Sequence, residues 1–492
     1  MSQTRSRTSR DQVQKLKSLS VPYTTCEVLA VIARVSLLLC LVSSISLAIY
    51  TSFYDRQHWL RSPNITRSSP YRRADGPTNI SHVVFGLGGS TATWDKRSLY
   101  SSVWWSPNVT RGFVWLDTIP KTTTNITSPK PPCRVSSPEW KRFRFSSSRS
   151  AVRIARIVTD TFKLGLPNVR WFVMGDDDTV YFTHNLESVL AKYDHNQMWY
   201  IGGNSESVEQ NLMHSYDMAF GGGGFAISYP LAERLVAVFD GCLDRYFKFY
   251  GSDQRIWACI SEIGVRLTRE RGFHQLDIRG NPYGLLAAHP SAPLVSLHHL
   301  DHLSPLFPDQ DKLESLRILT KAYHLDPPRI LQQTFCHDHK RQWSLSVSWG
   351  YTVQLYPLLL PAMDLQTPLR TFKTWRSWSN GPFTFNTRPI SPNPCEQPFT
   401  FMLNRFSAVD DRGTLTGYKR VAYTPDNKCS KSAAYTQALS ISGALVSSVK
   451  MDPYYWTKDQ ARRRQCCELV RVEKSIMHIR IRNCRSWETV TT

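Results

Sequence analysis

The sequence has few acidic residues for its length and no internal repeat. Its 492 residues include 39 Asp and Glu against 60 Lys and Arg, which gives a formal net charge of +21. Such a charge invites nucleic acid as a partner, but the basic residues are spread through the chain and no nucleic-acid-binding motif accompanies them. We therefore expect no nucleic-acid partner. The excess is typical of a solvated surface, and a basic surface also suits nucleotide diphosphates, acidic glycans or a membrane face.

Three familiar ligand-binding patterns are missing or incomplete. The glycines from Gly86 to Gly89 fall short of the dinucleotide fingerprint, because Thr91 stands where its third glycine is required. No EF-hand pattern is present. The adjacent Cys466 and Cys467 do not have the spacing of a tetrahedral zinc site. These absences argue against a dinucleotide-dependent oxidoreductase, an EF-hand calcium protein and a zinc module.

The first long apolar run covers residues 28–50 and is interrupted by Arg34, which can snorkel to lipid headgroups. The preceding segment carries five basic residues against Asp11 and Glu27, so the positive-inside rule keeps the N-terminus cytoplasmic. A cleaved signal peptide is the alternative, but the basic leader is long and no small-residue cleavage motif follows. We expect a basic cytoplasmic tail at 1–27, a type II signal anchor at 28–50, and a lumenal remainder.

Glycosylation sequons and cysteines fit a lumenal location. Four Asn-x-Ser/Thr sequons follow the anchor, at Asn64, Asn79, Asn108 and Asn125. Nine of the eleven cysteines also lie beyond it, where an oxidising compartment favours disulfides. We therefore expect a disulfide-bonded glycoprotein, although the sequence leaves the pairing open.

The region after the anchor divides by composition. Residues 51–80 are rich in Ser, Pro, Arg and Asn and predict a lumenal stem. Residues 81–324 alternate apolar strand patterns with helical ones, for example a strand at 82–85 that ends in a glycine turn, a helix at 154–162 and a helix that Pro230 opens. This alternation predicts an α/β domain with a mainly parallel sheet and ligands at the carboxyl ends of the strands.

The last third, residues 325–492, predicts a β-rich module that contains cysteines. From Trp343 to Leu355 apolar and small or polar residues alternate without a break, which predicts one strand with one buried face. Weaker alternation at 399–403 and 477–481 predicts further strands, separated by turns.

Three consecutive aspartates, Asp176, Asp177 and Asp178, follow the apolar run 171–174 with only Gly175 between. Carboxylates at the end of a buried strand repel one another and lose hydration, so a divalent cation or a metal–polyphosphate complex would neutralise them. An inert acidic turn is the alternative. We expect Asp178 to hold the metal, with Asp176 and Asp177 at the ribose of a nucleotide or in the outer shell of the metal.

Three motifs together resemble the Fringe-related glycosyltransferases of plants, which belong to the β-1,3-glycosyltransferase family that includes animal Fringe. They are Arg170–Thr179 with the aspartates, the glycine-rich Gly221–Ser228, and Tyr250–Asp253. The resemblance runs from about His82 through Phe307 and continues into the tail at 385–389 and 464–467. The aspartates alone are moderately specific, but their order and spacing with the glycines, Asp253 and the pair His298 and His299 are strongly specific.

The resemblance implies a GT-A fold, a Golgi location, an inverting mechanism and dependence on Mn²⁺. It assigns Asp178 as a metal ligand, Asp253 as the catalytic base and a histidine as a second metal ligand, for which we favour His298 over His299. The alternative for Asp253 is a contact with the dipole of the helix that begins there. Gly222 and Gly223 would let the backbone approach the donor sugar, and the alternative is a flexible loop.

The expected activity is transfer of a sugar from a UDP-sugar to a hydroxyl of a glycan or glycoprotein, with a β-1,3 linkage. A second hypothesis is an inactive carbohydrate-binding relative, in which Trp375 and Trp378 are stacking platforms, although burial in a core is the commoner role of a tryptophan. A dinucleotide-dependent oxidoreductase is a distant third, because its glycine fingerprint is incomplete and the region is lumenal.

Overall fold

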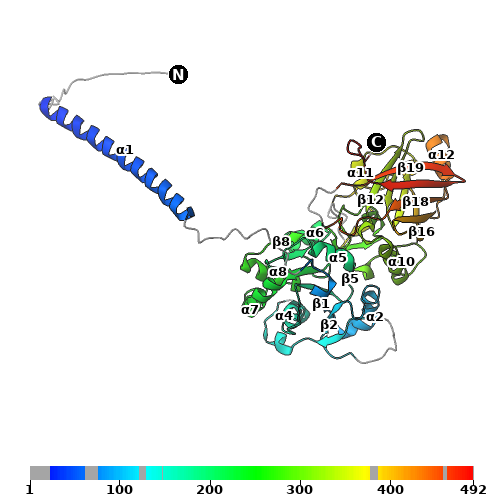
Figure 1. Cartoon of the computed structure of the whole chain (residues 1–492), viewed down its shortest axis with the longest axis horizontal. Coiled ribbons are helices and arrows are strands. Elements are labelled where there is room, and N and C mark those ends of the chain that lie inside the picture. The colour runs from blue at the N-terminus through cyan, green and yellow to red at the C-terminus, as the bar shows by residue number, and fades with distance from the viewer. Residues whose placement is uncertain are drawn as a thin grey trace, which may run out of the picture. The chain divides into compact units, whose positions relative to one another are not determined.

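The computed structural model describes residues 23–60, 76–120, 129–146, 148–376, 386–457 and 463–490, and within the first range the side chains of 29–50. Contacts divide the chain into two units, Met1–Gly76 and Pro77–Thr492. The first unit contains helix α1 (Tyr23–Leu60), drawn in blue in Figure 1. Its segment Leu29–Tyr50 has a mean hydropathy of 2.2 and is long and apolar enough to cross a membrane. This matches the length and composition expected of a single-pass anchor.

The first part of the second unit is built on a seven-stranded sheet in the order β3-β2-β1-β4-β7-β6-β8. Its strands are β1 (Val83–Gly88), β2 (Arg111–Leu116), β3 (Cys133–Val135), β4 (Trp171–Asp176), β6 (Tyr200–Gly202), β7 (Phe225–Ser228) and β8 (Leu267–Arg269). Strand β7 runs antiparallel to both of its neighbours, and the other pairings are parallel. The mainly parallel α/β sheet expected from the sequence is therefore confirmed, with β7 as its antiparallel strand.

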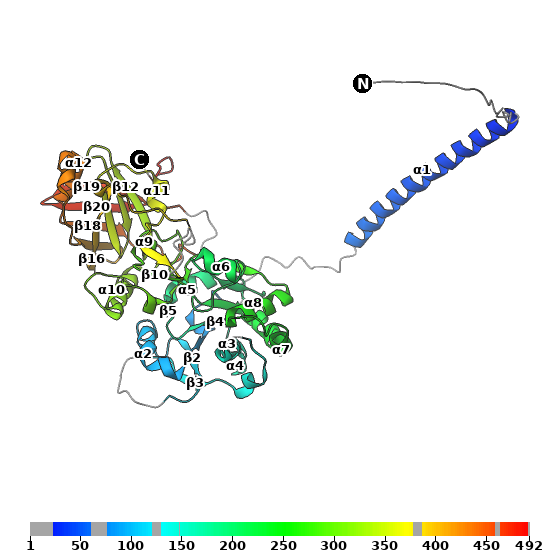
Figure 2. The same cartoon turned by 180° about the vertical axis from the view of Figure 1, so that it is seen from behind.

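Helices cover both faces of this sheet. One face packs against α3 (Arg149–Ala155), α4 (Ile157–Phe162), α7 (Tyr229–Arg245) and α8 (Ser252–Ile263), which lie together in Figure 2. The other face packs against α2 (Thr91–Ser101) and α5 (Thr183–Leu190). Neighbouring residues of one strand join different cores, as Val83 and Val84 do, because successive side chains of a strand point to opposite faces.

Two local predictions in this domain were wrong. The expected glycine turn at Gly86 is instead the continuation of β1, because a Cβ on Gly86 would lie 2.6 Å from Met174 Cε and 2.8 Å from Thr161 Oγ1. Glycine therefore lets α4 and β4 pack closely against β1. The single helix expected at 154–162 is two helices, α3 and α4, which meet at Arg156.

The C-terminal part forms an eight-stranded sheet in the order β12-β13-β14-β16-β17-β18-β20-β19. Its strands are β12 (Gln333–Asp338), β13 (Trp343–Ser348), β14 (Thr352–Tyr356), β16 (Phe399–Ala408), β17 (Gly413–Arg420), β18 (Gly443–Val449), β19 (Cys466–Glu473) and β20 (Ile476–Arg482). A disulfide between Cys336 and Cys467 joins the first and last strands, so the sheet curls back on itself. The β-rich module is confirmed.

Eight cysteines form four disulfides, Cys242–Cys259, Cys336–Cys467, Cys395–Cys429 and Cys466–Cys484. Cys133 and Cys40 are free and exposed. The expected disulfides are present. Of the four sequons, Asn79 and Asn108 are exposed, whereas Asn64 and Asn125 lie outside the described residues.

The unbroken alternation from Trp343 to Leu355 is a hairpin rather than one strand. The chain turns at Gly350, whose φ is +76°, and β13 then pairs antiparallel with β14. Both faces of the hairpin are buried. The small polar residues tolerate burial because they form hydrogen bonds: Ser344 Oγ accepts one from Leu360 N, and Ser346 Oγ accepts one from Gln333 Nε2. The alternation therefore marks small against large residues, not exposed against buried ones.

The two sheets share one hydrophobic core across helix α10 (Lys312–Leu325), where Tyr323 packs edge-on against Phe182. Two small sheets lie between them. Strands β5 (Val180–Tyr181), β11 (Ser296–Leu297) and β9 (Phe273–His274) form one, and β10 (Ile278–Gly280) pairs with β15 (Phe372–Thr374) in the other. Strand β15 of the C-terminal module thus pairs directly with β10, which belongs to the domain that contains the seven-stranded sheet.

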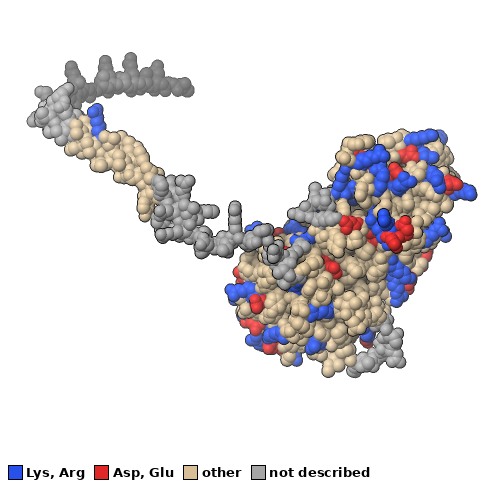
Figure 3. Space-filling model, in the orientation of Figure 1, with Lys and Arg blue, Asp and Glu red and all other residues tan. Residues whose placement is uncertain are grey.

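On the face shown in Figure 3, lysine and arginine are scattered over the Pro77–Thr492 unit among acidic and neutral residues. No single basic stripe of the kind that follows a nucleic-acid backbone covers that face.

Candidate metal centre and catalytic site

The aspartates lie at the carboxyl end of β4. The strand is buried from Trp171 to Gly175, and the chain then turns tightly, with Thr179 N donating to Asp176 O at 3.1 Å. The hydroxyl of Thr179 accepts from Asp176 N at 2.8 Å and donates to Gly222 O at 2.7 Å. The hydroxyl of Thr179 therefore fixes this turn to the glycine-rich segment. The aspartates lie at the carboxyl end of a strand, where ligands bind in α/β sheets.

Strand pairing brings His298 to Asp178. Leu297 of β11 pairs with Val180 of β5, so the residue after Leu297 lies beside the residues before Val180. His298 Nε2 is 3.1 Å from Asp178 Oδ1 and 3.5 Å from Asp176 Oδ2. One possible ligand atom from each of these three residues lies within 4.8 Å of the others.

The donor set fits a divalent cation. Asp178 is fully buried, and its two carboxylate oxygens have ion-pair contacts, with His298 at 3.1 Å and Arg97 at 3.3 Å, but no well-aligned hydrogen bond within the described part of the chain. Buried polar atoms without hydrogen bonds are costly unless a ligand satisfies them. Two carboxylates and an imidazole are ligands that divalent metals accept. These three residues could therefore hold a metal ion.

Charges within the cluster are strongly coupled. Burial alone would lower the pKa of His298, but the carboxylates of Asp178 and Asp176 raise that pKa to about 9. Burial alone would raise the pKa of Asp178, but His298 and Arg97 lower it below its usual range. Burial raises the pKa of Asp176. Asp178 is therefore the carboxylate held most firmly in its charged form.

Asp177 points away from this cluster. Its carboxylate accepts hydrogen bonds from Arg97 Nη1 at 3.0 Å and Thr93 Oγ1 at 3.2 Å, both on α2. Arg97 also lies 3.3 Å from Asp178 Oδ2 and 3.5 Å from Asp301 Oδ2. The sequence grouped Asp176 with Asp177, but the structure groups Asp176 with Asp178.

Arg97 is a residue of this site that the sequence analysis missed. It contacts both Asp177 and Asp178, and no motif in the sequence of α2 marks it. Its position follows only from the packing of α2 against the end of β4.

The ring of His299 packs against the ring of His298, with 3.9 Å between their centroids, but it contacts Asp277 rather than the aspartate cluster. The backbone of His299 is left-handed, with φ of 55°, and its ring lies 3.0 Å from Asp277 Oδ1. The ring also stacks on Trp375 at 4.6 Å between centroids, with 10° between the planes. The pair lies just after β11 rather than within it, and only His298 reaches the aspartates.

The glycine run is packed, not a flexible loop. Gly222 and Gly223 are buried, and a Cβ on Gly222 would overlap the ring of His298. Gly223 N donates a hydrogen bond to Gln275 Oε1 at 2.5 Å, and Gly224 has φ of +84° beside Tyr181. We expected the glycines to leave room for the donor sugar. At Gly222 that room is occupied by the ring of His298.

Asp253 lies in the first turn of α8, as expected. Its Oδ2 accepts from Gly221 N at 3.1 Å and its Oδ1 accepts from Gln254 N at 2.9 Å. Burial raises its pKa, and these two hydrogen bonds oppose the shift. Asp253 and Asp176 line one small cavity, so the carboxylate is within reach of the aspartate cluster as well as of the helix N-terminus.

Comparison with known families and structures gives three results. Residues 102–279 match the family described as Fringe-like, and residues 210–467 match the family described as Protein of unknown function, DUF604. The apo form of mouse xyloside xylosyltransferase 1 is similar over 38% of this chain and 84% of its own, with 10% identity and a TM-score of 0.24, and a likeness this weak carries no further argument. Curated proteins give no match.

The two matched ranges together contain the residues of the candidate site, except Arg97. The Fringe-like match contains the three aspartates, the glycine run and Asp253, and the DUF604 match spans more than half of the chain and includes His298. The chain therefore belongs to the DUF604 family and is a Fringe-related glycosyltransferase.

Proposed function

We propose that this glycosyltransferase is an inverting, metal-dependent enzyme that moves a sugar from a UDP-sugar to a hydroxyl of a glycan or glycoprotein, with formation of a β-1,3 linkage. One observation carries the proposal. Asp176, Asp178 and His298 converge within 4.8 Å at the end of β4, and Asp176 lines the same cavity as Asp253. This arrangement supports a nucleotide-diphosphate site with a base beside it.

Asp178 and His298 would hold the metal ion, with Asp176 as a third ligand. The oxygen and nitrogen donors suit Mn²⁺, which the resemblance to Fringe-related enzymes implies. When bound, the cation would neutralise negative charge that develops on the departing diphosphate. Asp178 supports this role because Arg97, 3.3 Å away, favours its ionised form, while His298 would coordinate the cation as a neutral imidazole. Asp177 would act through Arg97, which it holds beside Asp178.

Asp253 would act as the general base. The acceptor hydroxyl attacks the anomeric carbon while its proton passes to a carboxylate oxygen of Asp253, the new C–O bond forms, and the bond to UDP breaks. Attack opposite the leaving group inverts the anomeric centre. A raised pKa makes Asp253 a stronger base than an ordinary aspartate, and hydrogen bonds from Gly221 and Gln254 fix its orientation.

We place the enzyme in the Golgi membrane, with a single type II anchor and the catalytic domain in the lumen. Helix α1 is long and apolar enough for the anchor. Four disulfides in the Pro77–Thr492 unit fit an oxidising compartment. Exposed sequons at Asn79 and Asn108 are accessible to the glycosylation machinery of that compartment.

The test is UDP release by the full-length chain, purified in detergent and supplied with a panel of UDP-sugars and Mn²⁺. We expect release with at least one donor and its loss when EDTA removes the metal. Calorimetric titration with UDP and Mn²⁺ distinguishes the second hypothesis, an inactive carbohydrate-binding relative, because such a protein should not bind UDP. Absence of both UDP binding and release would reject the proposed function.

A further inference from the structure

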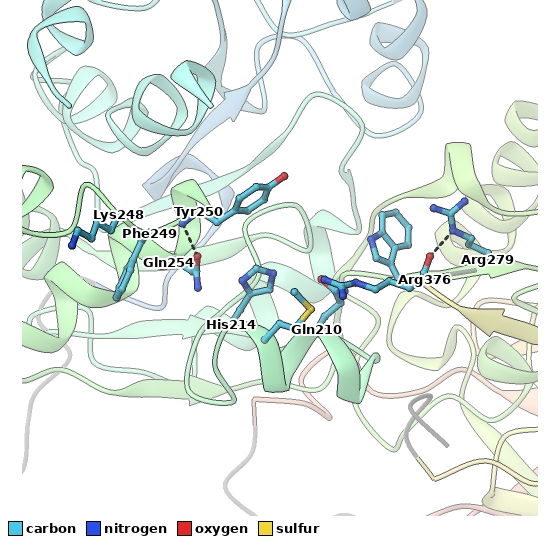
Figure 4. Close-up of a pocket in the computed structure, with 10 residues that line it drawn as sticks. Gln210, His214, Lys248, Phe249, Tyr250, Gln254, Arg279 and Arg376 are labelled. Carbon is cyan, nitrogen blue, oxygen red and sulfur yellow. Dashed lines mark hydrogen bonds between the residues drawn. The ribbon is translucent and has the colours of Figure 1, made fainter. Parts of the chain in front are cut away.

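A second cavity, of about 600 Å³, opens beside the first turn of α8. Figure 4 shows its lining, which comes from α6 (Val208–Met213), from the loop before α8, from β10, and from the segment just after β15. The cavity therefore joins the sheet that holds the aspartates to the C-terminal module.

The lining of this cavity is basic and aromatic. Its charged side chains are Lys248, Arg279 and Arg376, and no carboxylate belongs to the described lining. Arg376 Nε lies 3.3 Å from Glu209 Oε1, and this glutamate, which does not line the cavity, holds the guanidinium in place. Phe249, Tyr250 and Trp375 supply the aromatic surface. Aromatic rings offer apolar surface to the faces of sugar rings, while guanidinium groups bind carboxylates through two parallel hydrogen bonds.

The wall contributed by the C-terminal module is held firmly. Strand β15 pairs with β10, and Arg279 Nε donates to Trp375 O at 2.6 Å. The Arg279 guanidinium lies 5.2 Å from the centroid of the Trp375 ring, and the same ring stacks on His299. The module therefore places Trp375 against His299, the residue next to the histidine that contacts the aspartates.

The opposite wall is formed by residues that flank Asp253, which itself lines the small cavity described above. Tyr250 and Gln254, which line the second cavity, lie three residues before and one residue after Asp253. Gln254 Oε1 accepts from Tyr250 N at 3.1 Å and from Gly251 N at 3.2 Å, so this loop is fixed relative to the helix. None of the residues of the aspartate cluster lines the cavity, so the diphosphate of a donor belongs elsewhere.

We propose that this cavity is the acceptor subsite and that it selects a glycan bearing a carboxylate, such as a uronic acid residue. The inference rests on the proposed function, because it takes Asp253 as the base. A sugar in the cavity would present its hydroxyl to Asp253, while Arg279 and Arg376 bind its carboxylate. The C-terminal module thereby takes part in the choice of acceptor. Lys248 lies at the other end of the cavity, away from both arginines (Figure 4).

The experiment compares three acceptors with the full-length enzyme: an oligosaccharide with a terminal uronic acid, its methyl ester, and the neutral counterpart. We expect kcat/KM for the acid to exceed that for the ester about tenfold or more, because the ester cannot accept charge-assisted hydrogen bonds from the guanidinium groups. Arg279→Gln and Arg376→Gln should each reduce this acid-to-ester ratio several-fold. Lys419→Gln, which changes an exposed lysine of β17 outside the lining, should preserve the ratio.

Equal kcat/KM for acid and ester, or an unchanged ratio in both glutamine variants, would overturn the inference. A preference for acid that appears only when the donor is a UDP-uronic acid would also overturn it, since the carboxylate would then be read on the donor. Calorimetry separates the two proposals. If the acidic oligosaccharide binds in a charge-dependent way but no donor is turned over, the carboxylate-binding subsite stands and the proposed enzymatic function is rejected. If neutral acceptors are turned over as efficiently as acidic ones, the enzymatic function stands and the subsite is rejected.

Discussion

The ring of His298 occupies the space into which a side chain on Gly222 would project. Gly222 in turn accepts a hydrogen bond through its carbonyl from Thr179, one residue after Asp178. The glycine run thus holds the histidine and the aspartates in one arrangement, and its lack of side chains is required for that packing.

The first prediction concerns Gly222→Ala. The added methyl group overlaps the His298 ring, so the ring must move away from Asp178 and Asp176. We expect the affinity for Mn²⁺, measured by calorimetry, to fall about 10- to 100-fold, as it does when groups that orient metal ligands are altered. Gly241→Ala in α7 is the control, because a Cβ there meets only the end of the Arg245 side chain at 3.4 Å. Equal metal affinity in both variants would contradict the packing argument.

The second prediction concerns Arg97→Gln. The change leaves the buried carboxylates of Asp177 and Asp178 without their cation, so we expect the Tm of the metal-free protein to fall, with about 2–3 kcal/mol of unfolding free energy lost. Mn²⁺ should restore part of this loss, because it brings positive charge to Asp178. Arg317→Gln, which breaks an exposed pair with Glu314, should cost about 0.5 kcal/mol or less, whatever the metal. Thermal denaturation with and without Mn²⁺ measures both. A loss in Arg97→Gln that is as small as the control's would count against the role of Arg97.

The third prediction concerns pH and Asp253. A base works when deprotonated, and burial raises the pKa of Asp253, so activity should be full above that pKa and should fall as the pH drops through it. The acid limb of kcat/KM should therefore lie above the usual range of an aspartate. Asp253→Asn should keep UDP-sugar binding and lose turnover about 100-fold or more. Weakened binding with normal turnover would refute the base role.

The fourth prediction ranks two disulfides. Cys336–Cys467 spans 131 residues and joins the outer strands β12 and β19, whereas Cys395–Cys429 spans 34. Because a longer loop loses more entropy on closure, removing the first by paired serine substitutions should cost about 1 kcal/mol more than removing the second. Urea denaturation of the two double variants measures the difference. A greater loss for the shorter loop would show that native packing, not chain entropy, dominates.

Much of the fold was visible in the sequence because it follows from local patterns. The apolar run before Asp176 predicted β4, Pro230 predicted the start of α7, and the position of Asp253 predicted the first turn of α8. These features depend on residues close together in the chain, where periodicity and helix-start preferences act.

The arrangement of the site was less accessible, because it depends on contacts between distant elements. The choice between His298 and His299 rests on the pairing of β11 with β5 and on the left-handed backbone of His299. Arg97 is brought to Asp178 only by the packing of α2. The hairpin at Gly350 was hidden because the alternation continues through its turn. No local pattern records such contacts.

The central claim is that Asp178 holds a metal ion needed for sugar transfer, and one measurement tests it most directly. The rate of UDP release from the preferred UDP-sugar in Mn²⁺ is compared between the wild-type chain and Asp178→Ala. We expect the wild type to show Mn²⁺-dependent release and the variant to lose about 100-fold or more of the rate. Release by Asp178→Ala at the wild-type rate would contradict the account.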